Sequence, residues 1–297
     1  MKKVITALYF LIFGIISMPA LGHPTGNMIV VGDHVLWSYV CPLEDPGHHA
    51  CVMIWSDGKA PEPIIRSDFS ASDFILSHNE EQIYIMERRY NSNTQNNEVR
   101  ILKTTINKPP KEVWSWFEID LRIGEGGFFM PSNEEIIFVS YPGIYRMKRG
   151  EVPKPFFEFP EPVKRIRNIE DNHLLLLGEG KTWLNNPEGE IIREWDHLLF
   201  DTVKNAPLNR NQVFDVDYQT GELLLAYWGN RSFDIIKSHG NRETISQLKE
   251  PYAPHWVAYF GNRKLLFASR LVMDGTNPMP YLLIQSEDKT IRKLWTE

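Results

Sequence analysis

Residues 213–228 read Val-Phe-Asp-Val-Asp-Tyr-Gln-Thr-Gly-Glu-Leu-Leu-Leu-Ala-Tyr-Trp, and this stretch decides the fold. It holds a strand with alternating apolar residues, a polar turn that ends at Gly221, and a second strand that is more apolar throughout. Alternation of this kind on both sides of a Gly-containing turn is typical of an antiparallel β-hairpin. No long stretch of the chain has the 3.6-residue periodicity of a helix. We therefore expect an all-β protein.

The same hairpin pattern occurs six times, at spacings of 38 to 53 residues. Its second strands begin near Val35, Ile83, Ile136, Leu174, Leu223 and Leu265. A third and a fourth strand follow, as in residues 232–238 and 243–248 of the fifth unit. Four antiparallel strands that repeat about every 40–50 residues are the period of a propeller blade. A β-sandwich would need far fewer strands. The sequence predicts a six-bladed β-propeller of four-stranded antiparallel blades, from about Met28 to the end of the chain.

The unit pattern, as in residues 214–228 (FDVDYQTGELLLAYW), resembles the six-bladed propellers of the TolB-like and NHL/YVTN-like kind. It has no WD dipeptide series, kelch glycine pair or sialidase Asp-box. The resemblance implies one alternative function, a hydrolase, lactonase or lyase with a divalent ion such as calcium at the central channel. Acidic and amide side chains of the inner strands would hold that ion. The inner strands offer Asp73, Asn168, Asp215 and Asp217 for this role.

The first residues read as a targeting segment. Lys2 and Lys3 precede an uncharged stretch, residues 4–18, and Ala20-Leu21-Gly22 then forms a small-residue cleavage site before His23. The apolar run is shorter than the ~20 residues that a spanning helix needs. We expect residues 1–22 to be a cleavable signal peptide and residues 23–297 to be a single β-propeller domain. The protein is then exported, to the periplasm or beyond it.

The charge of the chain limits its partners. Removal of residues 1–22 takes away two of the 32 basic residues and none of the 38 acidic ones, so the formal charge moves from −6 to −8. An acidic protein without a Lys/Arg cluster is a poor ligand for nucleic acid, whose binding depends on neutralised phosphates. No second hydrophobic stretch is long enough to span a membrane.

The chain contains two cysteines, Cys41 and Cys51. They flank a loop with Pro46-Gly47 near its tip, and an isolated pair in an exported protein is commonly a disulfide. We expect Cys41 and Cys51 to face each other across the base of this hairpin and to form a disulfide bond.

Strand order divides the loops between two faces. One face receives the short turns between strands one and two and between strands three and four of each blade. The other, here called the loop-rich face, receives the two-to-three loops and the connections between blades, which are longer and irregular. Binding residues commonly lie on such loops. The candidate binding residues are Glu44, Asp45, His48, His49, Trp228, Arg231, His255, Trp256, Arg270 and Asp274.

No catalytic residue is predicted. The sequence has no nucleophile elbow, P-loop or dinucleotide fingerprint. Glu44, Asp45, His48 and His49 are the densest group of potential metal ligands, but no further ligand follows at a recognisable spacing, so we assign no metal or other cofactor. The leading hypothesis is an exported binding module that presents its loop-rich face to a protein or glycan partner. Residues 291–295 are predicted to form the outer strand of the last blade, with Leu294 or Trp295 packed between blades.

Overall fold

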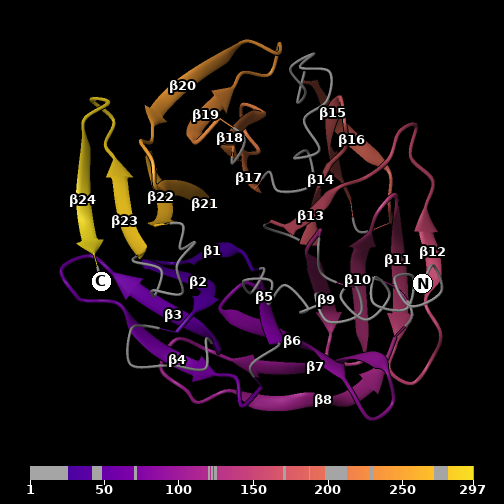
Figure 1. Ribbon diagram of the computed structural model, residues 1–297. Helices are drawn as coiled ribbons and strands as arrows, with labels where there is room; N and C mark the ends of the chain where they lie inside the picture. The colour runs from indigo at the N-terminus through magenta and orange to yellow at the C-terminus, as the bar shows by residue number, and fades with distance from the viewer. Residues whose placement is uncertain are drawn as a thin grey trace, which may run out of the picture.

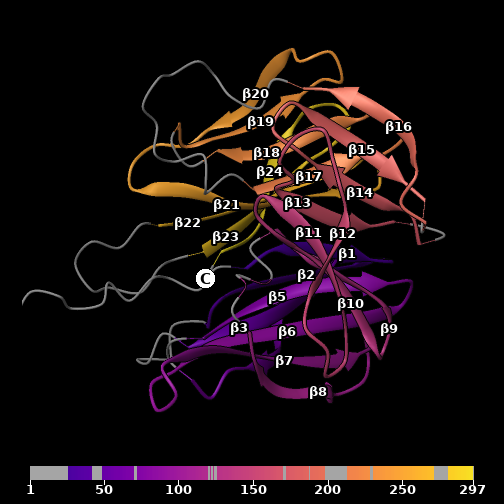
Figure 2. The ribbon, with the colours of Figure 1, turned by 90° about the vertical axis from the view of Figure 1, so that its right-hand side faces the viewer.

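The computed structural model describes residues 26–41, 49–69, 72–119, 121, 123, 126–169, 172–186, 188–197, 213–227, 230–270 and 280–296. Within them, 24 strands form six antiparallel sheets of four strands each. The predicted six-bladed β-propeller is therefore confirmed. In Figure 1 the sheets stand around a common axis, with the first strand of each blade innermost. Figure 2 views the same ring from the side. In the described part of the chain, no helix has the length and apolarity to cross a membrane.

Each blade is a simple antiparallel meander of four consecutive strands. Blades one to three consist of β1 (Met28–Val31), β2 (His34–Val40), β3 (Ala50–Ser56), β4 (Glu62–Arg66), β5 (Ser72–Asn79), β6 (Gln82–Asn91), β7 (Asn96–Thr104), β8 (Lys111–Glu118), β9 (Phe128–Ser132), β10 (Glu135–Ser140), β11 (Gly143–Lys148) and β12 (Lys154–Phe157). Blades four to six consist of β13 (Arg165–Asn168), β14 (Leu174–Leu177), β15 (Lys181–Asn185), β16 (Ile191–Asp196), β17 (Val213–Asp217), β18 (Glu222–Tyr227), β19 (Ser232–Ile236), β20 (Arg242–Gln247), β21 (Tyr252–Phe260), β22 (Arg263–Arg270), β23 (Pro280–Gln285) and β24 (Ile291–Thr296).

The second strands are rich in buried apolar residues because neighbouring blades cover both of their faces. In β14 all four residues are leucines, and all four are buried. The outermost strands are largely exposed, as in β16 and β24. Every blade also has a register shift between its third and fourth strands. Such bulges increase the local twist, which makes an exposed sheet edge a poorer template for pairing with another chain.

The hydrophobic core lies in the seams between blades. One cluster fills the seam between blades one and two, and others fill the next three seams in turn. The largest cluster joins blades five, six and one. In the seam between blades three and four, Gly127 has a φ of +87° and its Cα lies so close to β13 that an added Cβ would sit 2.7 Å from the carbonyl oxygen of Ile166. This seam therefore requires glycine at position 127.

Polar side chains connect the inner strands, which belong to separate sheets. Asn27 donates to the carbonyl of Leu76 at 2.8 Å and accepts from the N–H of the same residue at 2.7 Å, which joins blade one to blade two. Asp215 accepts the N–H of Tyr259 at 2.7 Å, which joins blade five to blade six. These bonds satisfy backbone groups that have no strand partner on the side facing the axis.

Candidate functional site

Half of the predicted binding residues lie outside the part of the chain that the structure describes. These are Glu44, Asp45, His48, Trp228 and Asp274. The predicted signal peptide of residues 1–22 and His23 also lie outside it. The described members of the predicted site are His49 on blade one, Arg231 on blade five, and His255, Trp256 and Arg270 on blade six.

Two of these residues connect loops on the loop-rich face. The His49 ring nitrogen Nδ1 lies 2.8 Å from Nη2 of Arg66 on β4. Arg231 donates to the carbonyl of Tyr252 at 2.9 Å and to the Glu250 carboxylate at 3.1 Å. Arg231 thus ties the β18–β19 connection to the segment that leads into blade six.

His255 and Trp256 belong to the seam between blades six and one. Trp256 is only 7% exposed and donates its indole N–H to the carbonyl of Ser38 at 3.0 Å. His255 Nε2 lies 2.6 Å from Oγ of Ser269, which in turn is 2.9 Å from the Tyr39 hydroxyl. A histidine beside a serine hydroxyl is the arrangement of an activated nucleophile. Ser269, however, is fully buried, so no substrate reaches it and the contact is structural.

The cysteines do not face each other as predicted. In the ladder between β2 and β3, Cys51 stands opposite Tyr39, and the N–H of Cys41 donates to the carbonyl of His49 at 2.8 Å. The two cysteines are therefore diagonal neighbours on one face of the hairpin. Diagonal pairs in a sheet are about 7–8 Å apart, at the limit of what a disulfide spans. The structure does not show the predicted bridge.

The inner-strand acids do not form the divalent metal site of the alternative function. Asp73 is held by both arms of the Arg88 guanidinium, at 2.7 and 2.6 Å. Asp215 is buried in an ion pair with Arg167. Among the described residues, no three His, Cys, Asp or Glu side chains come together as metal ligands. A carboxylate already neutralised by a guanidinium is a poor ligand for calcium, which is bound by several oxygen donors. These residues do not fit the ion.

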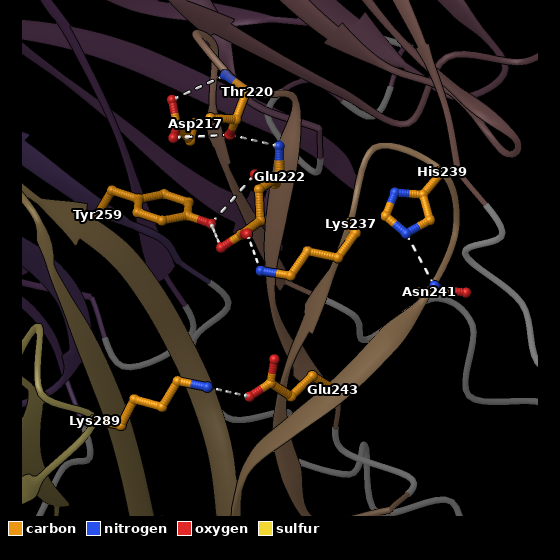
Figure 3. A network of polar contacts seen from close by, with 9 residues as sticks. All are labelled: Asp217, Thr220, Glu222, Lys237, His239, Asn241, Glu243, Tyr259 and Lys289. Atoms are coloured by element: carbon orange, nitrogen blue, oxygen red, sulfur yellow. Dashed lines mark hydrogen bonds and ion pairs between the residues drawn. The ribbon is translucent and has the colours of Figure 1, made fainter.

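Asp217 has a structural role at the opposite, short-turn face (Figure 3). Its carboxylate accepts the N–H of Gln219 and the hydroxyl of Thr220, which closes the turn before Gly221. Next to it, Glu222 forms an ion pair with Lys237 and accepts the Tyr259 hydroxyl at 3.2 Å. Burial, together with the Glu222 charge, raises the pKa of Tyr259. This network joins blades five and six.

A hollow of about 360 Å³ lies on the loop-rich face of blade two. The hairpin of β6 and β7, whose strands have ten and nine residues, forms one wall, and the segment that leads into blade three forms the other. Its lining residues are Asp73, Arg88, Arg89, Tyr90, Asn97, Glu98, Val99, Ile119, Leu121 and Ile123. Ligand pockets in proteins commonly have volumes of roughly 300–1,000 Å³, so the hollow is large enough for a small ligand.

Two cross-strand ion pairs lie at this end of blade two, one on each face of the sheet, because Arg88 and Arg89 are consecutive residues of β6. Arg88 stands opposite Asp73 in the sheet, and its Nη1 also donates to the carbonyl of Ile123 at 2.6 Å. Arg89 stands opposite Glu98 and donates to it at 2.8 Å. Hydrogen bonds from Asn91 and Arg89 lower the pKa of Glu98, so this carboxylate is ionised at neutral pH. The Arg88–Asp73 pair therefore presents a donor and an acceptor to the hollow in fixed positions, whereas the Arg89–Glu98 pair lies on the opposite face of the sheet.

Aromatic rings lie on both faces of this hairpin. The Arg89 guanidinium carbon lies 3.9 Å from the ring centroid of Trp116 and 4.2 Å from that of Phe69, so the guanidinium stacks on both. Tyr90 is 55% exposed. None of these residues except Asp73 was predicted to have a functional role from the sequence, and Asp73 was predicted to bind a metal. The hairpin register around the short turn at Glu80-Glu81 is the signal that could have identified Arg88 as the partner of Asp73.

Comparisons with known proteins support the fold but no specific function. No protein-family model and no curated protein sequence matches the chain. A Bacteroides thetaiotaomicron protein of unknown function has a similar structure, with a TM-score of 0.52 and 11% identity over 88% of this chain and 69% of the other. A virginiamycin B lyase from Staphylococcus aureus, solved with quinupristin, has a TM-score of 0.45 and 14% sequence identity. The match covers 93% of this chain and 85% of the lyase. A streptogramin B lyase has a TM-score of 0.47 and 13% sequence identity, and the match covers 95% of this chain and 86% of the lyase. The likeness is one of fold alone, in agreement with the predicted resemblance to TolB-like and NHL/YVTN-like propellers.

Proposed function

We propose that this protein is an exported binding module that holds a glycan on its loop-rich face and carries out no chemistry of its own. The observation that carries the proposal is the hollow on blade two, where the Arg88–Asp73 ion pair lies on the same face of the sheet as the exposed ring of Tyr90. Localisation outside the cytoplasm rests on the character of residues 1–22.

The chemistry of the hollow matches a saccharide. A sugar ring presents hydroxyl groups that both donate and accept hydrogen bonds, together with a C–H face that packs on an aromatic ring. Carboxylates accept and guanidinium groups donate, and the hollow offers one of each, Asp73 and Arg88, in fixed geometry. Tyr90 supplies an accessible ring, and the exposed amide of Asn97 is both a donor and an acceptor. Because the charged groups are already paired, a neutral ligand meets no net charge there.

A protein partner fits the hollow less well. The core of a protein–protein interface is apolar and depleted of charged residues, and its strongest contacts come from buried aromatic anchors. Among the described residues of the loop-rich face, the large exposed hydrophobic side chains are Tyr90 and Tyr141, and they belong to different blades. Two separate tyrosines do not make an apolar patch.

The enzyme alternative, with a divalent ion at the channel, has less support. It requires free oxygen ligands on the inner strands, whereas Asp73 and Asp215 are committed to Arg88 and Arg167. The one contact between a histidine and a serine hydroxyl described above, His255 with Ser269, has a serine that is fully buried.

Binding to a glycan array, followed by calorimetric titration of a retained saccharide, tests the proposal. We expect Tyr90→Ala to weaken the affinity roughly tenfold, which corresponds to about 1.4 kcal/mol. Tyr141→Ala is the matched control, because Tyr141 is 57% exposed on the same face but lies outside the hollow. Retention of no glycan by the wild-type protein contradicts the proposal, as does an equal loss of affinity in the two variants.

A further inference from the structure

The seam between blades four and five has the smallest hydrophobic core of the ring among the described residues. It lies between the sheets β13–β16 and β17–β20 (Figure 1). The other four clusters each contain nine or more buried residues. The cluster of this seam contains five, one from blade four and four from blade five: Leu177, Leu223, Leu225, Tyr227 and Ile236. Because hydrophobic stabilisation grows with the apolar area that is buried, this seam costs the least to separate.

Polar contacts hold the two ends of this seam. Near the axis, Arg167 of β13 forms an ion pair with Asp215 of β17. Toward the rim, Arg193 of β16 donates to the carbonyl of Gln219 in the β17–β18 turn at 2.8 Å. Groups released from such contacts form hydrogen bonds with water instead, so the net cost of breaking each one is small.

Blade four also presents buried polar side chains to this seam. Trp195 lies against the β17–β18 turn, where a Cβ added to Gly221 would sit 2.1 Å from the indole ring. Thr182 stands directly opposite Trp195 in the sheet, so both side chains lie on the face toward blade five. Trp195 Nε1 and Thr182 Oγ1 are buried, and neither has a hydrogen-bond partner within the described part of the chain. Both groups would gain partners in water if the seam opened.

His197 directly follows β16 and is only 2% exposed. Its N–H donates to the carbonyl of Gly180 at 2.6 Å, which holds the residue against blade four. Burial is the largest cause that lowers the pKa of His197 to about 4, while the main chain of Lys237 and the charge of Asp196 act in the opposite direction. The ring is therefore neutral at pH 7, and its interaction with Lys237 of blade five places it in the seam.

The charged and titratable groups on the elements around His197 belong to both blades. They are Glu161, Lys181, Asp196, Glu222, Lys237 and His239. Lys181 pairs with Asp196 at 3.3 Å, and Lys237 pairs with Glu222. The Asp196 side chain is 80% exposed, so water screens its charge. A proton on His197 would therefore meet little compensating charge in the closed seam.

We propose that the ring opens at the seam between blades four and five in acid, and that proton uptake by His197 is the trigger. Each blade is a complete sheet, so opening breaks no strand pairing except the single bridge between Asp196 and His239. In the open seam water hydrates the imidazolium, and its pKa returns from about 4 to the ordinary 6.5. Opening is therefore unaffected above pH 6.5 and becomes more favourable as the pH falls toward 4. These two pKa values predict that the equilibrium constant for opening rises about twentyfold from pH 7 to pH 5.

Thiol labelling of a buried cysteine measures this opening. Thr182→Cys places a thiol in the seam, at a side chain that is fully buried. Ser38→Cys is the matched control: its hydroxyl is equally buried and unpartnered among the described residues, but it lies on the face of β2 that carries Leu36, in the seam between blades one and two. The reagent is a dipyridyl disulfide, and peptide mass spectrometry follows each cysteine separately. Each rate is divided by the rate of the same variant unfolded in urea at the same pH.

We expect the normalised rate of Thr182→Cys to rise about twentyfold from pH 7 to pH 5, and that of Ser38→Cys to change less than about twofold. Adding His197→Asn to Thr182→Cys should remove the rise. An equal rise at both cysteines would show global unfolding and overturns the proposal, as does a rise that persists in the folded His197→Asn variant or a Thr182→Cys rate that does not respond to pH.

A second reporter and the full pH profile keep the test decisive if a variant does not fold. Leu225→Cys reports on the same seam from blade five, because Leu225 belongs to its cluster. One proton can raise the normalised rate by no more than tenfold per pH unit. A steeper rise would require further protons and would overturn the assignment of the trigger to His197 alone. The hollow on blade two takes no part in this opening, so the glycan-binding result does not bear on it.

Discussion

Trp295 on the last strand of the ring packs against Trp37 in the first blade, with 6.2 Å between their ring centroids. Trp37 also lies 5.5 Å from Phe267 of blade six. Blades one and six are each complete four-stranded sheets, and no strand is shared between them within the described residues. The ring is therefore closed by side-chain packing, and the prediction that Leu294 or Trp295 packs between blades is confirmed: both are half-buried against the largest core cluster.

Replacement of Trp295 by alanine tests this closure. Phe/Trp→Ala in a full core costs about 3–5 kcal/mol, and we expect roughly 1–3 kcal/mol for the half-buried Trp295. Ile291→Ala on the same strand is the control, because Ile291 is 38% exposed and its loss should change stability by less than about 0.5 kcal/mol. Urea unfolding measures both. Equal stability of the two variants would show that blade six is not held at Trp295.

Gly127 offers a test of the seam between blades three and four. Gly127→Ala adds a methyl group 2.7 Å from the carbonyl oxygen of Ile166 and forces an L-residue into a φ of +87°. Gly150 has a φ of +79° but nothing within 4 Å of the position of an added Cβ. Gly150→Ala therefore measures the conformational cost alone, about 1–2 kcal/mol. We expect a clearly larger loss of unfolding free energy for Gly127→Ala, and a loss equal to that of Gly150→Ala would refute the close approach of β13.

Two buried histidines make stability depend on pH. Burial is the largest cause that lowers the pKa of both His78 and His197 to about 4, with the charge of Arg167 adding to it at His78 and Asp196 opposing it at His197. Between pH 6.5 and 4 the unfolded chain therefore binds protons that the folded protein excludes. The free energy of unfolding should be highest above pH 6.5 and fall as the pH drops to 4, by up to about 3 kcal/mol per histidine.

Unfolding in urea at pH 7 and at pH 5 measures this effect above the range in which most carboxylates titrate. His197→Asn removes one of the two groups, so the difference in unfolding free energy between the two pH values should shrink in this variant. A wild-type protein that is equally stable at both pH values would mean that neither ring is buried as described.

The architecture was predictable because each blade repeats a local pattern. The six second strands begin within two residues of the predicted positions, since turns such as Gln219-Thr220-Gly221 mark their starts. The cysteine pair shows where this reading fails. Val40 stands opposite Ala50, so the partner of Cys41 is His49 and that of Cys51 is Tyr39. A hairpin pattern locates the turn. The spacing of the two cysteines does not reveal whether they lie directly opposite each other or are displaced by two positions along the partner strand.

The sites were less accessible to sequence reasoning because they depend on contacts between strands. Asp73 looks like a free carboxylate in the sequence, and only its place opposite Arg88 shows that it is neutralised. The Arg167–Asp215 ion pair depends on the approach of β13 and β17, which are separated in the chain by the other three strands of blade four and by the connection to blade five. Trp256, predicted to lie on an exposed loop, belongs to β21 and is buried in the seam between blades six and one, where its indole N–H reaches Ser38.

The most direct test of the proposed function is a crystal structure of the protein with a saccharide retained on the glycan array. The account predicts density for the sugar in the hollow on blade two, with its C–H face on the Tyr90 ring and its hydroxyl groups within hydrogen-bond distance of Arg88 or Asp73. A saccharide bound elsewhere on the propeller, with the hollow filled only by water, would contradict it.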